Sequence, residues 1–355
     1  MQSYLFLSIV NLKTCNMFEI KNFAKFLLIT SALSQFRPVS GALVAKLCNA
    51  TVPVMTVFAG VSYDGDDSIF HFGGLNVFPT EMDPELAMNA IWRYSISADA
   101  FDLVTRLPIG MLYPSIINSG DGTYHILGGA VDEFLPQYSV FKFSVENRTV
   151  TEVAQLPNIG QYMGAFKRDE ETVFLLRRDI SAAICKFNLS SYETVWCTPM
   201  GEEGQIRFQS TSILLDDVDR LAYIALFDNT ENQTVLRYDA VREEGTLINF
   251  GAKNFTGYAT SPTDSLRRYG YAMGSYNSVS SLLRFDFRTQ NVEYFPFEIS
   301  LPGVSSYGMG WSVFIPKLNG IYLFGGYLQS SFRKEVWFVD LVESEAGFRN
   351  RTIIP

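Results

Sequence analysis

The sequence predicts an all-β fold because a pattern of short strands recurs about every fifty residues. Each copy holds an apolar run that ends in glycine or its replacement, then a strand in which aromatic and basic residues alternate. A further apolar strand follows nine or ten residues later, and another strand opens each unit. Four short strands per unit, repeated six times, predict a six-bladed β-propeller, in which neighbouring sheets bury one another's faces.

The apolar runs mark the six copies. Three of them end in a double glycine: SIFHFGG at Gly74, TYHILGG at Gly129 and GIYLFGG at Gly326. The other three end at Arg178, Asp228 and Ser275, so that successive copies lie 47 to 55 residues apart. No residues remain for a seventh copy. The expected fold is therefore one six-bladed domain.

The next strand of each copy is the best preserved. It reads IWRY (91–94), VFKF (140–143), ICKF (184–187), VLRY (235–238), LLRF (282–285) and VWFV (336–339). On the strand after this one, Trp196 and, more loosely, Tyr294 occupy the position at which a known propeller repeat has a tryptophan. The double glycine, the aromatic strand and the later aromatic together resemble the kelch repeat over residues 42–355. The resemblance implies four-stranded kelch-type blades and, by fold analogy alone, a binding role.

The first strand after residue 42 is expected to close the ring. LVAKL (43–47) matches LVTRL (103–107) and VAQL (153–156), which are fourth strands of blades. An N-terminal strand of this kind would complete the last blade. Residues 348–354 compete for the same place, and the sequence leaves that choice open.

The amino terminus is typical of an export signal. Lys21 and Lys25 precede an apolar run over 26–33, and Ala32-Leu33-Ser34 fits a small-x-small cleavage pattern. We expect residues 1–34 to be a signal peptide, with Met17 as an alternative start, and 35–355 to be the propeller. The alternative is an uncleaved signal anchor, for which the run is short. Cleavage predicts a secreted protein without stable membrane insertion.

Sequons and cysteines fit the same compartment. We expect N-glycosylation at six N-x-S/T sequons, which are Asn49, Asn147, Asn188, Asn232, Asn254 and Asn350. Cys185 and Cys197 fall opposite each other if the turn between their strands centres on Ser191, which predicts a disulfide in an exported chain. Cys15 leaves with the signal. Cys48 then stands alone, and is either buried or bonded to a partner chain.

Charge and histidine content argue against several classes of function. A net charge of −9 disfavours nucleic acid, and two histidines in the chain disfavour zinc or copper chemistry. His71 and His125, each just before a double glycine, are interpreted as equivalent positions of successive repeats, which favours blade packing over the copper site of galactose oxidase. The acidic turns 64–67 and 216–219 lack calcium-loop spacing. We therefore expect no catalytic residues, no metal and no cofactor.

The remaining hypothesis is a binding site on the loops of one face. Glycans at Asn232 and Asn254 would occupy that face at blades four and five, which leaves blades one to three open to a protein or glycan partner. The alternatives are a structural subunit of an extracellular assembly and an enzyme of the sugar mutarotase or oxidase kind. The candidate ligand-binding residues are Phe78, Glu81, Asp83, Glu85, Asp132, Glu133, Phe134, Tyr138, Arg177, Arg178, Tyr327 and Arg333.

Overall fold

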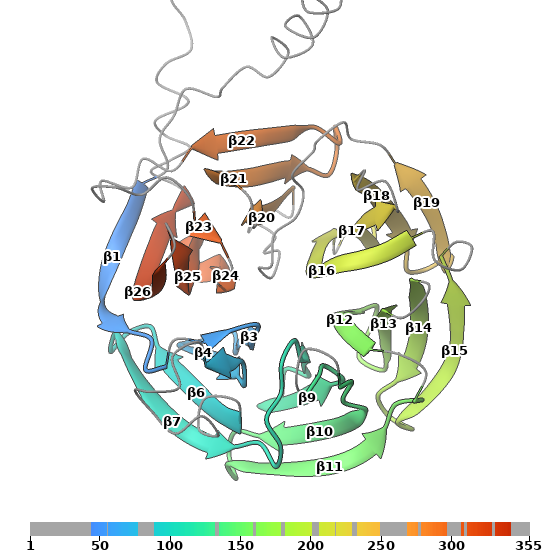
Figure 1. Ribbon diagram of the computed structural model, residues 1–355, viewed down its shortest axis with the longest axis horizontal. Helices are drawn as coiled ribbons and strands as arrows, with labels where there is room; N and C mark the ends of the chain where they lie inside the picture. The colour runs from blue at the N-terminus through green and yellow to red at the C-terminus, as the bar shows by residue number, and fades with distance from the viewer. Residues whose placement is uncertain are drawn as a thin grey trace, which may run out of the picture. The chain divides into compact units, whose positions relative to one another are not determined.

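The computed structural model describes most of the second of two compact units, residues 40–355. The described residues are 44–54, 56–76, 89–131, 135–158, 161–178, 182–200, 206–216, 218–228, 233–248, 268–275, 278–296, 307–308, 311–328 and 331–341. They form six antiparallel sheets arranged around an axis (Figure 1). The predicted six-bladed β-propeller is confirmed.

Each blade follows the chain from the axis outward. Blade one contains β3 (Gly60–Tyr63), β4 (Ser68–Phe72), β6 (Ala90–Ser95) and β7 (Ala100–Arg106). Blade two contains β8 (Ser115–Asn118), β9 (Thr123–Leu127), β10 (Ser139–Ser144) and β11 (Thr149–Gln155). Blade three contains β12 (Gln161–Lys167), β13 (Thr172–Arg178), β14 (Ala183–Asn188) and β15 (Glu193–Pro199).

The second half of the ring repeats this order. Blade four contains β16 (Ile206–Asp216), β17 (Leu221–Asp228), β18 (Gln233–Asp239) and β19 (Glu244–Ile248). The described part of blade five contains β20 (Tyr269–Ser275), β21 (Ser278–Asp286) and β22 (Val292–Pro296). Blade six contains β24 (Trp311–Ile315), β25 (Gly320–Leu328), β26 (Ser331–Asp340) and β1 (Val44–Thr51), with β23 (Tyr307–Gly308) also on β25. The short strands β2 (Thr56–Val57) and β5 (Leu75–Asn76) pair beside blade one, and η1 (Pro316–Leu318) links β24 to β25.

The N-terminal strand closes the ring, as its sequence match predicts. β1 pairs antiparallel with β26, with Ala45 opposite Val339, and so supplies the outer strand of blade six (Figure 1). The Asp99 carboxylate of blade one accepts the backbone N–H of Asn49 at 2.6 Å and of Ala50 at 3.2 Å. The closing strand is therefore fixed to blade one as well as to blade six. Residues 348–354 lie outside the described residues.

The core lies between the blades. Among the described residues, side chains from two neighbouring sheets meet in one hydrophobic cluster at each of five joints, those from blade six through blade one to blade five. At the joint of blades one and two, the rings of Phe70 and Tyr124 lie 5.2 Å apart, and those of Phe70 and Phe143 lie 5.9 Å apart. Blades one to four are thus buried on both faces by their neighbours, which explains why their strands are so rich in aromatic residues.

Candidate functional site

The two faces of the ring differ in their connections. Hairpins between first and second strands and between third and fourth strands share one face, which we term the hairpin face. Connections between second and third strands and between blades share the opposite face, which we term the loop face. On the loop face, 73–89 in blade one and 128–138 in blade two are long. The equivalent connections are only residues 276–277 in blade five and 329–330 in blade six.

The double glycine that precedes a long connection holds one blade against the next. Gly128 and Gly129 have φ of 62° and 91°. A Cβ on Gly128 would lie 2.6 Å from the Cβ of Tyr162, and one on Gly129 would lie 2.5 Å from the carbonyl oxygen of Leu112. The Gly129 N–H donates to the Tyr162 carbonyl of blade three at 2.8 Å. Both glycines are therefore required by this close approach of two backbones.

Three of the predicted site residues lie together on the loop face. Tyr138 is half-buried and packs on the core between blades two and three. The backbone N–H of its neighbour Gln137 donates to the carbonyl of Gly129, and the N–H of Gly129 donates to the carbonyl of Tyr162. Tyr162 is in turn opposite Arg177 in the β12–β13 ladder. Arg178 follows as the last residue of β13 and is exposed. A continuous backbone path thus joins the three predicted residues Tyr138, Arg177 and Arg178.

Other predicted residues are placed differently or not described. Tyr327 and Arg333 are not in a loop, because β25 and β26 continue past them, with Tyr327 opposite Phe332 and Gly326 opposite Arg333. The prediction that these two residues lie in a loop is wrong, because the strand does not end at the double glycine. The predicted residues outside the described part of the chain are Phe78, Glu81, Asp83, Glu85, Asp132, Glu133 and Phe134.

His71 is enclosed by aromatic rings at the joint of blades six and one. Its ring lies 4.6 Å from Phe324, 5.4 Å from Trp311 and 5.6 Å from Phe101, measured between ring centroids, and each pair meets edge to face. The side chain is buried, and burial lowers its pKa to about 3. His71 is therefore a neutral packing residue at physiological pH.

His125 has a different environment from His71. His71 is opposite Trp92 in its ladder and His125 is opposite Lys142, one position further along the repeat, so the two rings project from opposite faces of their sheets. The two residues are therefore not repeat equivalents, contrary to the interpretation from the sequence.

Ser119, His125 and Tyr192 form a hydrogen-bonded chain that the sequence analysis missed. Nδ1 of His125 lies 3.1 Å from Ser119 Oγ, and Nε2 lies 3.3 Å from Tyr192 Oη in blade three. Burial, with the charge of Lys142, lowers the pKa of His125. The partner at Nε2 is a phenol and the partner at Nδ1 is a hydroxyl, so neither is the carboxylate that orients the histidine of a catalytic triad. The three groups instead fasten the outer turn of blade three to blade two.

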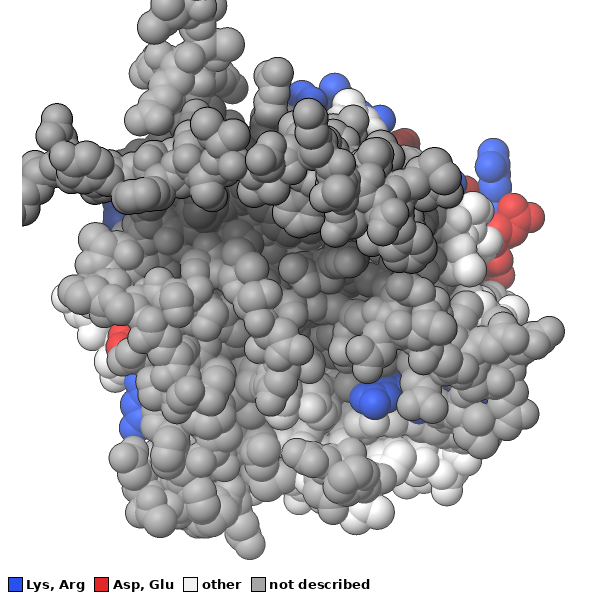
Figure 2. Space-filling view, turned by 45° about the horizontal axis from the view of Figure 1, so that its top comes forward, with Lys and Arg blue, Asp and Glu red and all other residues white. Residues whose placement is uncertain are grey.

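The acidic turns cap backbone groups. Asp64 Oδ1 accepts the N–H of Asp66 at 2.8 Å and of Ser68 at 3.0 Å, and Asp216 Oδ1 accepts the N–H of Val218 at 3.0 Å. Within the described ranges, no group of three or more His, Cys, Asp or Glu side chains is placed to hold a metal ion. Acidic and basic side chains lie next to one another at one edge of the molecule (Figure 2).

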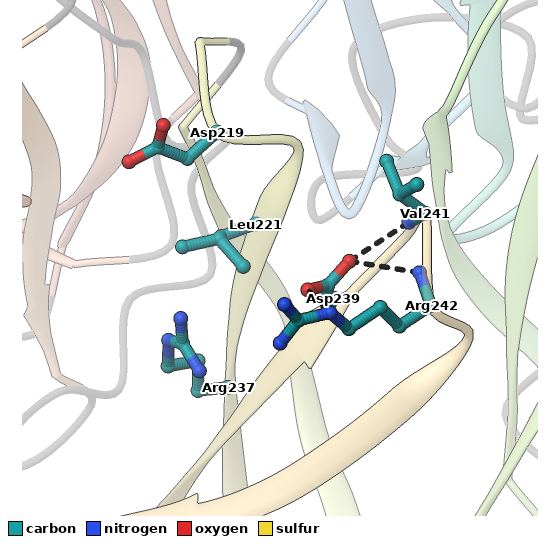
Figure 3. A pocket seen from close by; sticks show the side chains of 6 residues that line it. All are labelled: Asp219, Leu221, Arg237, Asp239, Val241 and Arg242. Atoms are coloured by element: carbon teal, nitrogen blue, oxygen red, sulfur yellow. Dashed lines mark hydrogen bonds and ion pairs between the residues drawn. The ribbon is translucent and has the colours of Figure 1, made fainter.

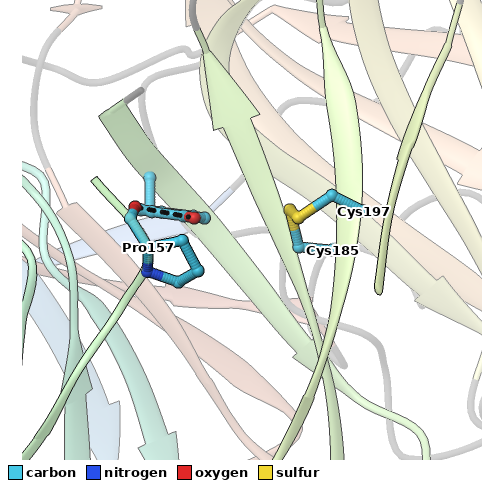
Figure 4. Close-up of a disulfide and its surroundings, with 4 residues drawn as sticks. Pro157, Cys185 and Cys197 are labelled. Atoms are coloured by element: carbon cyan, nitrogen blue, oxygen red, sulfur yellow. Dashed lines mark hydrogen bonds between the residues drawn. A yellow bond between two sulfur atoms is a disulfide. The ribbon is translucent and has the colours of Figure 1, made fainter. Parts of the chain in front are cut away.

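The predicted disulfide is present. Cys185 is directly opposite Cys197 in the β14–β15 ladder, and the two are bonded, with Cα atoms 4.0 Å apart (Figure 4). The bridge faces the core between blades two and three, near Pro157, whose carbonyl accepts the hydroxyl of Tyr162 at 3.2 Å. Cys48 is unpaired and partly buried on β1 against the core of blades six and one.

Three of the predicted sequons lie in the described residues. Asn49 is exposed on β1, and Asn147 is exposed in the β10–β11 turn. Asn188 ends β14, and its Oδ1 caps the following turn. Asn147 and Asn188 are thus on the hairpin face, away from Tyr138 and Arg178. Asn232, Asn254 and Asn350 lie outside the described residues.

No protein-family model and no curated protein matches this chain. The fold and the placement of individual residues therefore carry the functional argument. The described part of the chain contains no helix with the length and apolar character needed to cross a membrane.

Proposed function

We propose that this chain is an exported kelch-type propeller that binds a protein or glycan partner through the loop face of blades one to three. The single observation that supports this best is the uneven length of the loop-face connections. Residues 73–89 and 128–138 connect the second and third strands of blades one and two, whereas two residues suffice in blades five and six. Long segments on a rigid frame are where binding residues concentrate.

The kelch assignment rests on the double glycines and on what they do. In blades one and two the second glycine of the pair donates its N–H to the next blade, Gly74 to Met111 and Gly129 to Tyr162, both at 2.8 Å. This joint explains why the repeat retains two glycines in blades one and two. The same joint fixes the base of each long connection against the neighbouring blade.

Export is supported by the signal-like amino terminus and by the Cys185–Cys197 disulfide, since disulfides persist in oxidising compartments. A binding role without catalysis is supported by the two histidines, because His71 is enclosed by aromatic rings and His125 is bonded to Ser119 and Tyr192. Aromatic residues and arginines at the loop face suit a partner surface, where such side chains carry much of the binding energy.

The test is a binding screen with matched variants. The secreted protein is tested against an array of glycans and a display library of extracellular protein domains. Partners found with the native protein are then measured with Arg178→Glu on the loop face and with Arg288→Glu, an exposed arginine of the β21–β22 turn on the hairpin face. We expect Arg178→Glu to weaken binding about tenfold or more, and Arg288→Glu to have little effect.

A second variant replaces residues 77–87 with a short Gly-Ser segment and leaves the described strands of blade one intact. We expect this variant to lose the same partner while keeping its thermal stability. The proposal is contradicted if binding survives both the replacement and Arg178→Glu, or if Arg288→Glu is the damaging change.

A further inference from the structure

A pocket opens on the hairpin face of blade four, opposite the face proposed above for the partner. It lies between the β16–β17 and β18–β19 hairpins and has a volume of about 290 Å³ (Figure 3). This volume is close to the lower limit for small-molecule sites, so a ligand would be smaller than a typical drug. The lining residues are Asp219, Leu221, Arg237, Asp239, Val241 and Arg242.

Arg237 differs from the two other arginines at the same position of the repeat, although Lys142 of blade two is also opposite a threonine, Thr151. Arg93 of blade one is opposite Asp102 on the fourth strand and pairs with it at 2.9 Å. Arg284 of blade five is opposite Glu293 and pairs with it at 2.6 Å. Arg237 is instead opposite Thr246. Blade four therefore keeps the cation of the repeat and omits the carboxylate that neutralises it.

The guanidinium of Arg237 has hydrogen-bonding capacity to spare. Its side chain forms one hydrogen bond, with Tyr223, whereas its buried Nε–H has no hydrogen-bond partner among the described residues. A buried donor without an acceptor lowers stability, and an oxygen of a bound ligand would satisfy it. A carboxylate is the best acceptor for this group, because it takes two parallel N–H bonds from one guanidinium.

The other charged residues define two further sides of the pocket. Arg242 extends its guanidinium toward Arg237, which places two cations on the same side (Figure 3). Asp239 is engaged within the protein, because its Oδ1 accepts the backbone N–H of Val241 and of Arg242, both at 2.9 Å, and its Oδ2 forms a long ion pair with Nε of Arg242 at 3.8 Å. Asp219 stands on the other hairpin and is exposed, and no described residue forms an ion pair with it.

We propose that this pocket binds a small zwitterion with the chemistry of an apolar α-amino acid. The carboxylate of the ligand bonds to Arg237 and Arg242, and its ammonium group bonds to Asp219. Leu221 and Val241, the two uncharged lining residues, contact the side chain of the ligand. The site is independent of the loop face, so either proposal can fail without the other.

Charge balance favours a zwitterion over other anions. The pocket has two arginines and two aspartates, so its formal charges cancel. A phosphate or another dianion would bring its second negative charge close to Asp219 and Asp239, where it would be repelled. Asn188 of blade three holds the turn position that Asp239 holds in blade four. A glycan on the Asn188 sequon would therefore stand on blade three, and not on blade four, which has the pocket.

The test is calorimetric titration of the secreted full-length protein with L-leucine and two matched analogues. 4-Methylpentanoate lacks the ammonium group and L-leucinamide lacks the carboxylate. We expect L-leucine to bind, and each analogue to bind about tenfold more weakly or worse. The proposal is overturned if L-leucine gives no binding up to about 10 mM, if the analogues bind equally well, or if inorganic phosphate binds more tightly.

Variants assign the effect to the pocket. Arg237→Gln should weaken L-leucine binding about tenfold or more, whereas the matched change Arg93→Gln in blade one should not. If Arg237→Gln does not fold, Asp219→Asn tests the exposed side of the site, and it should reduce binding of L-leucine but not of 4-methylpentanoate. Unchanged L-leucine affinity in Asp219→Asn, or in a folded Arg237→Gln protein, would overturn the assignment.

Discussion

His71 connects the stability of the ring to pH. The imidazole is buried among Phe101, Trp311 and Phe324 at the joint where the ring closes, and its pKa is about 3 in the folded protein against an ordinary value of 6.5. As the pH falls below 6.5, the unfolded chain binds a proton that the folded chain excludes. The free energy of unfolding therefore falls with decreasing pH until about pH 3, where the folded protein is protonated as well.

This argument predicts the behaviour of His71→Phe. The variant should lose this acid sensitivity, which amounts to about 1.4 kcal/mol for each pH unit in that range. Phenylalanine suits the site because its neighbours are aromatic rings. The measurement is urea unfolding of the native protein and the variant at pH 7, 5.5 and 4. Parallel loss of stability in the two proteins on acidification would show that His71 is not the acid-sensitive group.

At the scale of the element, five blades build the turn between their third and fourth strands in the same way. A side-chain oxygen at the end of the third strand accepts backbone N–H groups two or three residues later, and the residue four positions later has a left-handed φ. The accepting residues are Ser95, Ser144, Asn188, Asp239 and Asp286. The left-handed residues are Asp99, Arg148, Tyr192, Glu243 and Gln290, with φ between 46° and 59°. None of them is glycine, so glycine spacing does not reveal the turn in the sequence.

The double-glycine element gives a second prediction. Gly129→Ala would place a Cβ 2.5 Å from the Leu112 carbonyl oxygen, in addition to the strain of a φ of 91°. Gly65 has a φ of 94° and nothing within 4 Å of an added Cβ, so Gly65→Ala is a control for backbone strain alone. We expect urea unfolding to show a loss of about 1–2 kcal/mol for Gly65→Ala and of about 3 kcal/mol or more for Gly129→Ala. Equal losses would mean that the close approach of this position to the Leu112 carbonyl contributes little.

Across the whole molecule, repetition and local pairing explain which features the sequence could predict. The match of LVAKL to later fourth strands predicted closure by β1, and the spacing of Cys185 and Cys197 predicted their disulfide, because both depend on one ladder. Features that depend on where a strand ends were not predictable. Tyr327 and Arg333 continue the β25–β26 ladder beyond a double glycine that ends the strand in blade two. The one-residue offset between His71 and His125 is visible in the sequence, because His71 is two residues before Gly73 and His125 is three before Gly128, and the ladders confirm it.

Three kinds of interaction hold the ring closed. Hydrophobic clusters pack neighbouring blades together, and side chains of the hairpin face add hydrogen bonds from one blade to the one before it. Asn118 Nδ2 donates to the Tyr63 carbonyl at 2.9 Å, and Arg220 Nη1 donates to the Arg168 carbonyl at 2.7 Å. The third is the pairing of β1 with β26, together with the hydrogen bond that Asp99 accepts from the backbone of β1. A mature chain that begins shortly before β1 keeps every part of this ring, which links the predicted cleavage to the fold.

Mass spectrometry of the protein secreted from eukaryotic cells tests the central claim, that this propeller is exported, most directly. The protein is measured intact and deglycosylated, reduced and non-reduced. We expect a monomer that starts near Gln35, carries glycans at sequons that include Asn49 and Asn147, and contains one disulfide between Cys185 and Cys197. A product that stays in the cytosol, retains Met1 and carries no glycan would contradict export and would favour an intracellular role for the same propeller.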